Sequence, residues 1–321
     1  SKNFCEIIGL GLNGFKYRNN LILNAGNSGT LGRLILGLLV HSKKKIKIKG
    51  DKSLSKRDFL RVIEPLEKFG AKLNSNYGKL PINIQGTNYS KPIKYFENKG
   101  SAQCKSAVMF AALNTSGETI IKAKKSRDHS ELLFKHLKLP IKIIKKNKYD
   151  VIKVIGKCNI PAINYKIPSD ISSAAFFIVL TALSKNSSLK IKDVNINPSR
   201  MGVFYILKLM GIKISKFNIK NYKGEKIADL LIKSPNKIKP INCPIRFNSS
   251  AIDEFLLIFL VAAKAKGVSY FKNLSELDKK ESPRLIWASK ILSYMGIKNI
   301  RNKHSIKIFG NPNLLIKRNI Y

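Results

Sequence analysis

The chain has 321 residues, 44% of them hydrophobic, and a formal net charge of +41 at pH 7. This length and apolar content exclude a disordered chain and allow two domains with sizeable cores. Only ten of the 60 basic residues are arginine. Each arginine is therefore informative, because guanidinium groups are preferred where a carboxylate or phosphate is held at two points.

The four cysteines are Cys5, Cys104, Cys158 and Cys243, and they show neither a CxxC spacing nor a histidine cluster. We therefore expect no metal site, no disulfide framework and a reducing, cytoplasmic compartment. The longest apolar runs are too short to span a bilayer, so we expect no membrane partner. The chain begins at Ser1 without methionine, and we expect its N-terminus to be incomplete.

The segment from Asn24 to Arg33 predicts a loop that leads into a buried helix. Gly26 and Gly29 allow backbone conformations that side chains forbid, and Ser28 is a natural N-cap residue. Free backbone N–H groups at such a helix start, aided by the helix dipole, can bind an anion. An ordinary helix start is the alternative interpretation.

The same pattern recurs three more times, which indicates an internal repeat. Each unit has a helix, a short Lys/Ile strand, a loop with Ser and Arg, a second amphipathic helix and two strands. The loop arginines are Arg57, Arg127, Arg200 and Arg284, with separations of 70, 73 and 84 residues. Second helices are expected to end at Gly70, Gly211 and Gly296.

Alternating strands and helices predict the α/β class. A boundary is expected near residues 161–168, which gives a first domain of residues 1–165 and a second of residues 166–321. Each domain then contains two of the repeated units.

Seven motifs, in order and over about residues 21–310, resemble the 5-enolpyruvylshikimate-3-phosphate synthase family of enolpyruvyl transferases. They are Gly26-Asn27-Ser28-Gly29-Thr30 with Arg33, Gly50-Asp51 with Ser53-Leu54 and Arg57, Ser101-Ala102-Gln103 with Lys105-Ser106, Ser126-Arg127-Asp128-His129, Asp170 with Ser172-Ser173-Ala174-Ala175, Ile252-Asp253-Glu254, and Lys280-Glu281-Ser282 with Arg284. Each motif alone is weak, and seven at family spacing are specific.

The resemblance implies a two-domain inside-out α/β barrel of βαβαββ units, with helices inside, sheets outside and a cleft that closes on substrate. Four of the six family units are expected here, without the first and the last. The Lys-Ser…Asn-Arg loop and the Asp-His-Arg segment that those units would carry do not occur in this sequence. We therefore expect a fragment or a decayed copy, poorly active alone, with apolar flanks left uncovered in both domains.

The implied reaction moves the enolpyruvyl group of phosphoenolpyruvate to the 5-hydroxyl of shikimate 3-phosphate and releases phosphate, a step of aromatic amino-acid biosynthesis. The resemblance implies no metal, no organic cofactor, no nucleic-acid partner and a monomer when complete. The chemistry requires a base at the hydroxyl, an acid at the vinyl CH₂ and cations around the negative charge.

The resemblance also implies roles at matched positions. Asp253 takes the hydroxyl proton, Glu281 donates or relays a proton, and Lys280 is the cation beside it. The positions implied for phosphoenolpyruvate are Gly29, Arg57, Gln103 and Arg284. The positions implied for shikimate 3-phosphate are Ser101, Ala102, Gln103, Ser126, Arg127, Asp253 and Lys280. From the residues alone, Asp253 also fits a helix N-cap, and Arg200, Ser172 and Ser173 fit repeat architecture.

Three departures from the family pattern bear on activity. Pro283 stands where the family usually has Asp, Asp278-Lys279 replaces Arg-Val, and Asp58 replaces Pro. Pro283 stiffens the loop between Glu281 and Arg284, so a shift of either side chain is a hypothesis that the structure can address.

Three alternatives stay open at this point. UDP-N-acetylglucosamine enolpyruvyl transferase resembles the same fold but uses a loop cysteine as acid, whereas Cys104 falls at a helix start. A basic nucleic-acid-binding protein fits the charge but not the scattered lysines. A non-catalytic scaffold that keeps the fold is the third.

Overall fold

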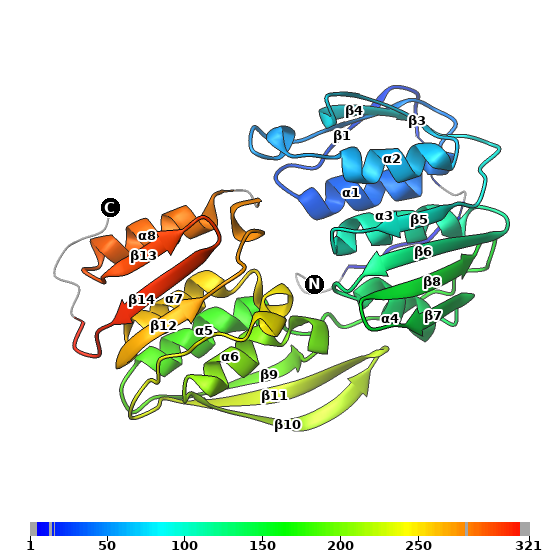
Figure 1. Ribbon diagram of the computed structural model, residues 1–321. Coiled ribbons are helices and arrows are strands. Elements are labelled where there is room, and N and C mark those ends of the chain that lie inside the picture. The colour runs from blue at the N-terminus through cyan, green and yellow to red at the C-terminus, as the bar shows by residue number, and fades with distance from the viewer. Residues whose placement is uncertain (1–4, 13–14, 16, 280–281, 315–321) are drawn as a thin grey trace. The chain divides into compact units, whose positions relative to one another are not determined.

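The computed structural model describes residues 5–12, 15, 17–279 and 282–314. The chain divides into two compact units, Ser1–Asn164 and Tyr165–Tyr321 (Figure 1). Each unit has its own hydrophobic core, and each is described separately below.

The first unit contains two successive sets of elements. In order they are β1 (Leu21–Asn24), α1 (Gly29–Leu38), η1 (Leu39–His41), β2 (Ile46–Lys49), η2 (Leu54–Lys56), α2 (Leu60–Lys68), β3 (Lys72–Asn76) and β4 (Lys79–Gln85), then β5 (Lys94–Glu97), α3 (Ala102–Leu113), β6 (Glu118–Lys124), α4 (His129–His136), β7 (Ile141–Lys145) and β8 (Tyr149–Ile155).

The second unit has the same order of elements. They are α5 (Ile171–Leu183), β9 (Ser188–Asn195), η3 (Pro198–Arg200), α6 (Gly202–Leu209), β10 (Lys213–Tyr222) and β11 (Glu225–Lys233), then η4 (Ile245–Phe247), η5 (Ser249–Ala251), α7 (Phe255–Ala263), β12 (Gly267–Phe271), η6 (Leu277–Lys279), α8 (Arg284–Tyr294), β13 (Asn299–Asn302) and β14 (Ser305–Gly310).

The strand pairing shows that one connection is repeated. The sheets of the first unit have the orders β1-β2-β4-β3 and β5-β6-β8-β7, each with a parallel first pair and antiparallel remaining pairs. The second unit has the orders β10-β11-β9 and β12-β14-β13. There the parallel strand is reduced to single bridges, from Ser169 to Val194 and from Asn242 to Tyr270. The predicted α/β class is confirmed, and each repeat of the first unit begins with a strand, β1 or β5.

The helices of the first unit lie between its two sheets (Figure 1). Helices α1 and α3 pack closely at Gly37. A Cβ atom placed on Gly37 would lie only 2.2 Å from the backbone oxygen of Ala107. A side chain at residue 37 would force the two helices apart, so glycine at this position allows them to pack closely.

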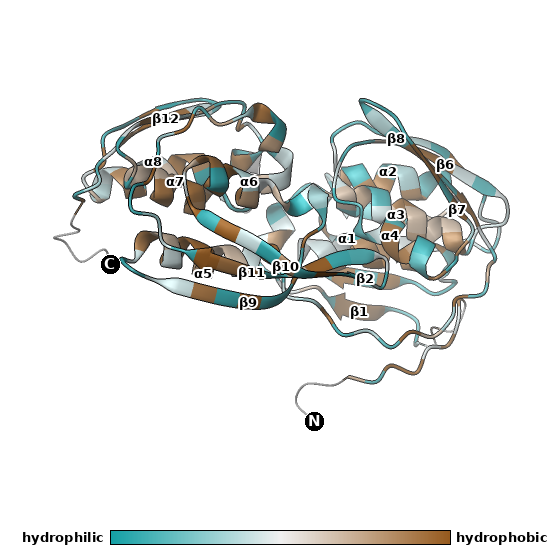
Figure 2. Cartoon of the chain, turned by 90° about the horizontal axis from the view of Figure 1, so that it is seen from below, coloured by the Kyte–Doolittle hydropathy of each residue, from teal (hydrophilic) through white to brown (hydrophobic). Residues whose placement is uncertain are grey.

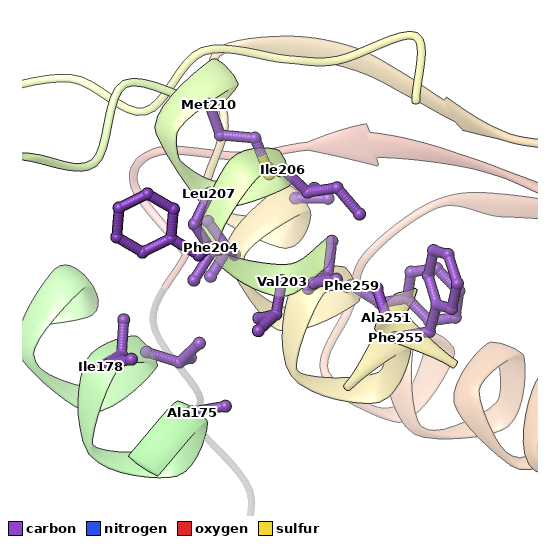
Figure 3. Packing of buried hydrophobic residues seen from close by; sticks show 14 of the residues in the cluster. Ala175, Ile178, Val203, Phe204, Ile206, Leu207, Met210, Ala251, Phe255 and Phe259 are labelled. Carbon is purple, nitrogen blue, oxygen red and sulfur yellow. The ribbon is translucent and has the colours of Figure 1, made fainter. Parts of the chain in front are cut away.

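The core of the second unit is formed by α5, α6 and α7 (Figure 3). Helix α7 has the sequence FLLIFLVAA, and Phe255 and Phe259 on it are fully buried. Figure 2 shows the apolar residues of this unit gathered on these helices. Helix α5 is predominantly apolar and leaves Phe176, Phe177 and Leu180 exposed. Among the described residues, no helix combines the length and hydropathy needed to cross a bilayer.

The second helix of every repeat ends in the same way. Gly70, Gly211 and Gly296 have positive φ and follow the last helical turns, as predicted. In the remaining repeat this position is Lys138, with φ 55°. The N–H of Lys138 donates to the oxygen of Lys135, and the N–H of Leu139 donates to the oxygen of Phe134, which is the Schellman pattern.

Lys138→Gly is expected to stabilise the protein by about 1 kcal/mol, because a left-handed backbone conformation penalises a residue with a Cβ atom. The matched control Lys135→Gly, inside α4, should lose about 1 kcal/mol through reduced helix propensity. The free energy of unfolding in urea measures both changes. A Lys138→Gly variant less stable than the parent would contradict this account.

A charged network stabilises an irregular place in the β10-β11-β9 sheet. The register shifts between Ala228 and Leu230, and Asp193 on β9 has φ 51°. The N–H of Asp193 donates to Asp229 Oδ1 at 3.0 Å, while Asn218 and Lys190 approach Asp229 Oδ2. These contacts, led by the backbone N–H of Asp193, lower the pKa of Asp229.

Because its pKa is lower in the folded chain than in the unfolded chain, Asp229 stabilises the fold above a pH of about 4, and this contribution is lost as the pH falls through the folded value. Asp229→Asn should therefore narrow the difference between the unfolding free energies at pH 7 and pH 3. The exposed control Glu67→Gln should leave that difference unchanged. Urea titrations at the two pH values measure it, and an unchanged difference in Asp229→Asn would refute the assignment.

Candidate active site

The loop before α1 and the loop before α2 are tied to each other. Ser28 is the N-cap of α1, as predicted, and its Oγ accepts from the N–H of Leu31 at 3.1 Å. The Asn27 side chain donates to Asp51 Oδ2 at 2.6 Å, and Asp51 Oδ1 accepts from the N–H of Leu54 at 2.7 Å. Asn27 thus shapes the loop, and Gly29 becomes the first residue of the helix.

Gly29 lies directly against two guanidinium groups. A Cβ atom on Gly29 would be 2.8 Å from Nη1 of Arg57 and 2.9 Å from Nη1 of Arg33. Arg57 follows the short helix η2, so the structure brings together two of the residues predicted to hold phosphoenolpyruvate. A side chain at residue 29 would displace one or both guanidinium groups from this helix start.

Arg33 connects the parts of this cluster and is only 8% exposed. Its guanidinium donates to Gln103 Oε1 at 2.8 Å and to the backbone oxygen of Asp58 at 2.9 Å, and it stacks on the Phe59 ring at 4.7 Å. Burial, and then the neighbouring Arg57 cation, lower the pKa of Arg33. The sequence analysis did not place Arg33 in the site. Its position on the apolar helix of residues 29–38 is the signal that could have found it.

The start of α3 supplies the next group of predicted residues. Ser101 is the N-cap, with Oγ accepting from the N–H of Cys104 at 3.3 Å, and Ala102 is the first helical residue. Gln103 is fixed at both ends of its amide, by Arg33 at Oε1 and by Thr30 through a bond of 2.7 Å from Nε2. The N–H groups of such a helix start have no intrahelical acceptor and are suited to an anion.

The loop before α4 carries Ser126 and Arg127. Ser126 Oγ is buried and has no hydrogen-bond partner among the described residues. The backbone oxygen of Arg127 accepts from Lys105 Nζ at 2.9 Å. A hydroxyl that is buried without a partner loses its hydration, and a bound ligand oxygen would replace that loss.

In the second unit, two predicted residues form an ion pair. Arg284 Nη1 lies 3.1 Å from Asp253 Oδ1, and the two side chains are 22% and 26% exposed. The interpretation of Asp253 as a helix N-cap is wrong. Helix α7 begins at Phe255 with Glu254 at its N-cap position, so Asp253 lies one residue earlier and its carboxylate faces Arg284. Lys280 and Glu281 lie outside the described residues.

The departures from the family pattern have local structural roles. Pro283 occupies the N-cap position of α8, and its oxygen accepts the helical bond from the N–H of Trp287. Asp278 Oδ1 accepts from the N–H of Leu285 at 2.8 Å, so Asp278 provides the capping carboxylate. Arg284 is therefore the first residue of α8 and keeps its pairing with Asp253.

Arg200 belongs to a closed network within the second unit. It lies 2.9 Å from Asp170 Oδ1 and donates to Ser172 Oγ, which in turn donates to buried Glu254. This network joins the start of α5 to the residue that precedes α7. It fits the interpretation of Arg200 and Ser172 as repeat architecture.

Cys104 does not provide the acid of the alternative transferase. It is buried inside α3, and burial raises the pKa of its thiol. The four cysteines are free. No group of three or more His, Cys, Asp or Glu residues in the described part of the chain could hold a metal ion.

Comparison with known proteins identifies the family of the chain. The family model of EPSP synthase (3-phosphoshikimate 1-carboxyvinyltransferase) matches residues 2–314. The chain is 43% identical over 316 residues to the 3-phosphoshikimate 1-carboxyvinyltransferase of Ruthia magnifica subsp. Calyptogena magnifica, covering 97% of this chain and 71% of that protein. It is 38% identical over 296 residues to that of Petrotoga mobilis, covering 91% and 68%.

Solved structures show the same relation. An EPSP synthase from Acinetobacter baumannii superposes with a TM-score of 0.82 at 36% identity, covering 94% of this chain and 67% of that one. The enolpyruvyl transferase NikO from Streptomyces tendae gives a TM-score of 0.62 at 14% identity, covering 87% and 62%, which shows a shared fold.

The repeated α/β units, with a glycine, guanidinium groups and an amide at the helix starts of the first unit, have an enolpyruvyl-transferase fold. Within that class, the chain belongs to the EPSP synthase family, a family of transferases in aromatic amino-acid biosynthesis that use phosphoenolpyruvate and shikimate 3-phosphate. The UDP-N-acetylglucosamine and nucleic-acid alternatives are not favoured.

Arg33→Lys should raise the KM for phosphoenolpyruvate about tenfold, since a lysine cannot bond both Gln103 and Asp58 and a lost charged hydrogen bond is worth about 1.5–3 kcal/mol. Steady-state kinetics with varied phosphoenolpyruvate measure the effect. Arg301→Lys, at an exposed position of β13, is the matched control and should behave like the parent. An unchanged KM in Arg33→Lys would show that the cluster does not serve this substrate.

Proposed function

We propose that this chain transfers the enolpyruvyl group of phosphoenolpyruvate to the 5-hydroxyl of shikimate 3-phosphate by means of the residues described above. The observation that carries the proposal is the contact of Gly29 with the Arg57 and Arg33 guanidinium groups. Two cations at one helix start favour a ligand with more than one negative charge. Phosphoenolpyruvate is such a ligand, because it carries a carboxylate and a phosphate.

Binding is assigned to two groups of residues, one for each substrate. Gly29, Arg57, Gln103 and Arg284 are proposed for phosphoenolpyruvate. The start of α3 at Ser101 and Ala102, together with Gln103, Ser126 and Arg127, holds shikimate 3-phosphate. The buried Ser126 Oγ, which has no partner among the described residues, supports this second assignment.

Asp253 is proposed as the base, and both it and Lys280 as contacts of shikimate 3-phosphate. The 5-hydroxyl proton passes to the Asp253 carboxylate while the hydroxyl oxygen bonds to C2 of phosphoenolpyruvate, and a proton is added to the CH₂ group. Because the product again contains a vinyl group, that proton leaves as the bond to phosphate breaks. Glu281 is the proposed proton donor, with Lys280 as the neighbouring cation.

We further propose that the protein works in the cytoplasm as a monomer without a nucleic-acid partner. Four free cysteines fit a reducing compartment. The substrates are small and anionic, so a strongly cationic protein attracts them without any macromolecular partner.

Phosphate release from phosphoenolpyruvate, dependent on shikimate 3-phosphate, tests the function. The parent chain should show it, and Asp253→Asn should lower kcat by about 10²-fold or more, as expected for removal of a general base. Asp193→Asn, which removes a carboxylate paired with Lys166 and Lys220, is the control and should retain kcat. Full turnover by Asp253→Asn would overturn the assignment of the base.

A titration across salt concentrations separates the proposal from the nucleic-acid alternative. Shikimate 3-phosphate should bind, and single- or double-stranded DNA should bind only weakly and without preference. DNA binding with a steep salt slope, together with no binding of shikimate 3-phosphate, would favour the alternative function.

A further inference from the structure

Lys105 is a lysine in an unusual environment for this lysine-rich chain. It lies in α3, one turn after Ser101, and its side chain is 3% exposed. Its Nζ lies 2.5 Å from Glu131 Oε1, and the Glu131 side chain is 2% exposed. A buried ammonium group is tolerated only when a partner charge and hydrogen bonds replace its water.

The contacts of Lys105 join three separate segments. Lys105 itself lies in α3, its partner Glu131 lies in α4, and its second partner is the backbone oxygen of Arg127 in the loop before α4, at 2.9 Å. Ser106 Oγ, one residue after Lys105, and Ser130 Oγ, one residue before Glu131, lie 2.7 Å apart. These contacts therefore fix α3 to the start of α4. The ammonium group of Lys105 also holds the loop between β6 and α4 through the backbone oxygen of Arg127.

These segments carry the residues assigned above to one ligand. The start of α3 provides Ser101 and Gln103, and the loop provides Ser126 and Arg127. Lys105 is bonded to the oxygen of Arg127 and lies one helical turn from Ser101, so it sets the spacing between the two groups. This spacing determines the position of Ser126 Oγ. That hydroxyl is buried and lacks a partner among the described residues.

We propose that Lys105 is a positioning residue for shikimate 3-phosphate, which holds the Ser126–Arg127 loop at a fixed distance from the start of α3. This inference rests on the proposed function for the identity of the ligand. Lys105 does not itself contact the substrate, and its effect is transmitted through the backbone oxygen of Arg127.

The first measurement is kinetic and uses the full chain. Lys105→Met should raise the KM for shikimate 3-phosphate at least tenfold and change kcat at saturation by less than threefold. Lys135→Met, at an exposed position of α4, is the control and should leave both values unchanged. An unchanged KM for shikimate 3-phosphate in Lys105→Met would overturn the proposal.

The double variant Lys105→Met, Glu131→Leu separates positioning from charge compensation. It removes both buried charges, so folding should recover relative to Lys105→Met while the raised KM persists. Recovery of the parent KM in the double variant would show that Lys105 only neutralises Glu131, and the proposal would fail.

Amide hydrogen exchange in the ligand-free chain tests the tether independently of turnover. In Lys105→Met, exchange at residues 126–129 should be about tenfold faster, whereas β7 and β8 should be unaffected. Unchanged exchange would overturn the tether even if the enzyme is active. Faster exchange in a chain whose parent shows no turnover would reject the proposed function and leave the tether standing.

Discussion

The close crossing of α1 and α3 is the constraint on which the first unit depends. Gly37 allows it, since even a methyl group there would penetrate the backbone at Ala107. The crossing brings the starts of the two helices together, so Gln103 of α3 reaches Thr30 and Arg33 of α1. Gln103, which is proposed for both phosphoenolpyruvate and shikimate 3-phosphate, therefore links the two helix starts.

The energies of burial and pairing distinguish the charged side chains that organise the fold from those that lie on its surface. An exposed pair such as Lys166–Asp193, with the lysine side chain 80% exposed, contributes little to stability because water screens it. Burial of an ion costs several kcal/mol before any pairing. Arg33 and Lys105 are buried, and each bonds backbone or amide oxygens from other segments. These two cations therefore contribute to the architecture, whereas most of the other lysines are solvated.

Much of the fold could be predicted because the repeats carry local signals. Ser28 and Ser101 were predicted at helix starts, and Gly70, Gly211 and Gly296 at helix ends, from side-chain chemistry that acts within one turn. Lys138 escaped prediction because lysine gives no sign of a left-handed conformation. Lys105 escaped it because burial depends on α4, which is distant in sequence.

The candidate site was less predictable for the same reason. Asp253 fits an N-cap by composition, yet the helix starts two residues later and Arg284, 31 positions away, takes the carboxylate. Pro283 was expected to disturb the loop, but the structure gives it a helix-starting position that needs no N–H donor. Its neighbour Asp278 supplies the cap from another turn of chain. Contacts between positions that are far apart in the chain produce no periodic pattern in a single sequence.

The shortened leading strand of the third repeat has a consequence for how copies of this protein behave at high concentration. Within the part of the chain that the structure describes, strand β9 is bridged on its outer side only at Ser169, so most of that side has no strand partner there. Lysines alternate along it at Lys190 and Lys192. Lysine side chains along an edge strand disfavour its pairing with the same strand of another molecule. In composition alone, the lysine excess resembles a general bias. Part of it therefore opposes self-association of the protein through this sheet edge.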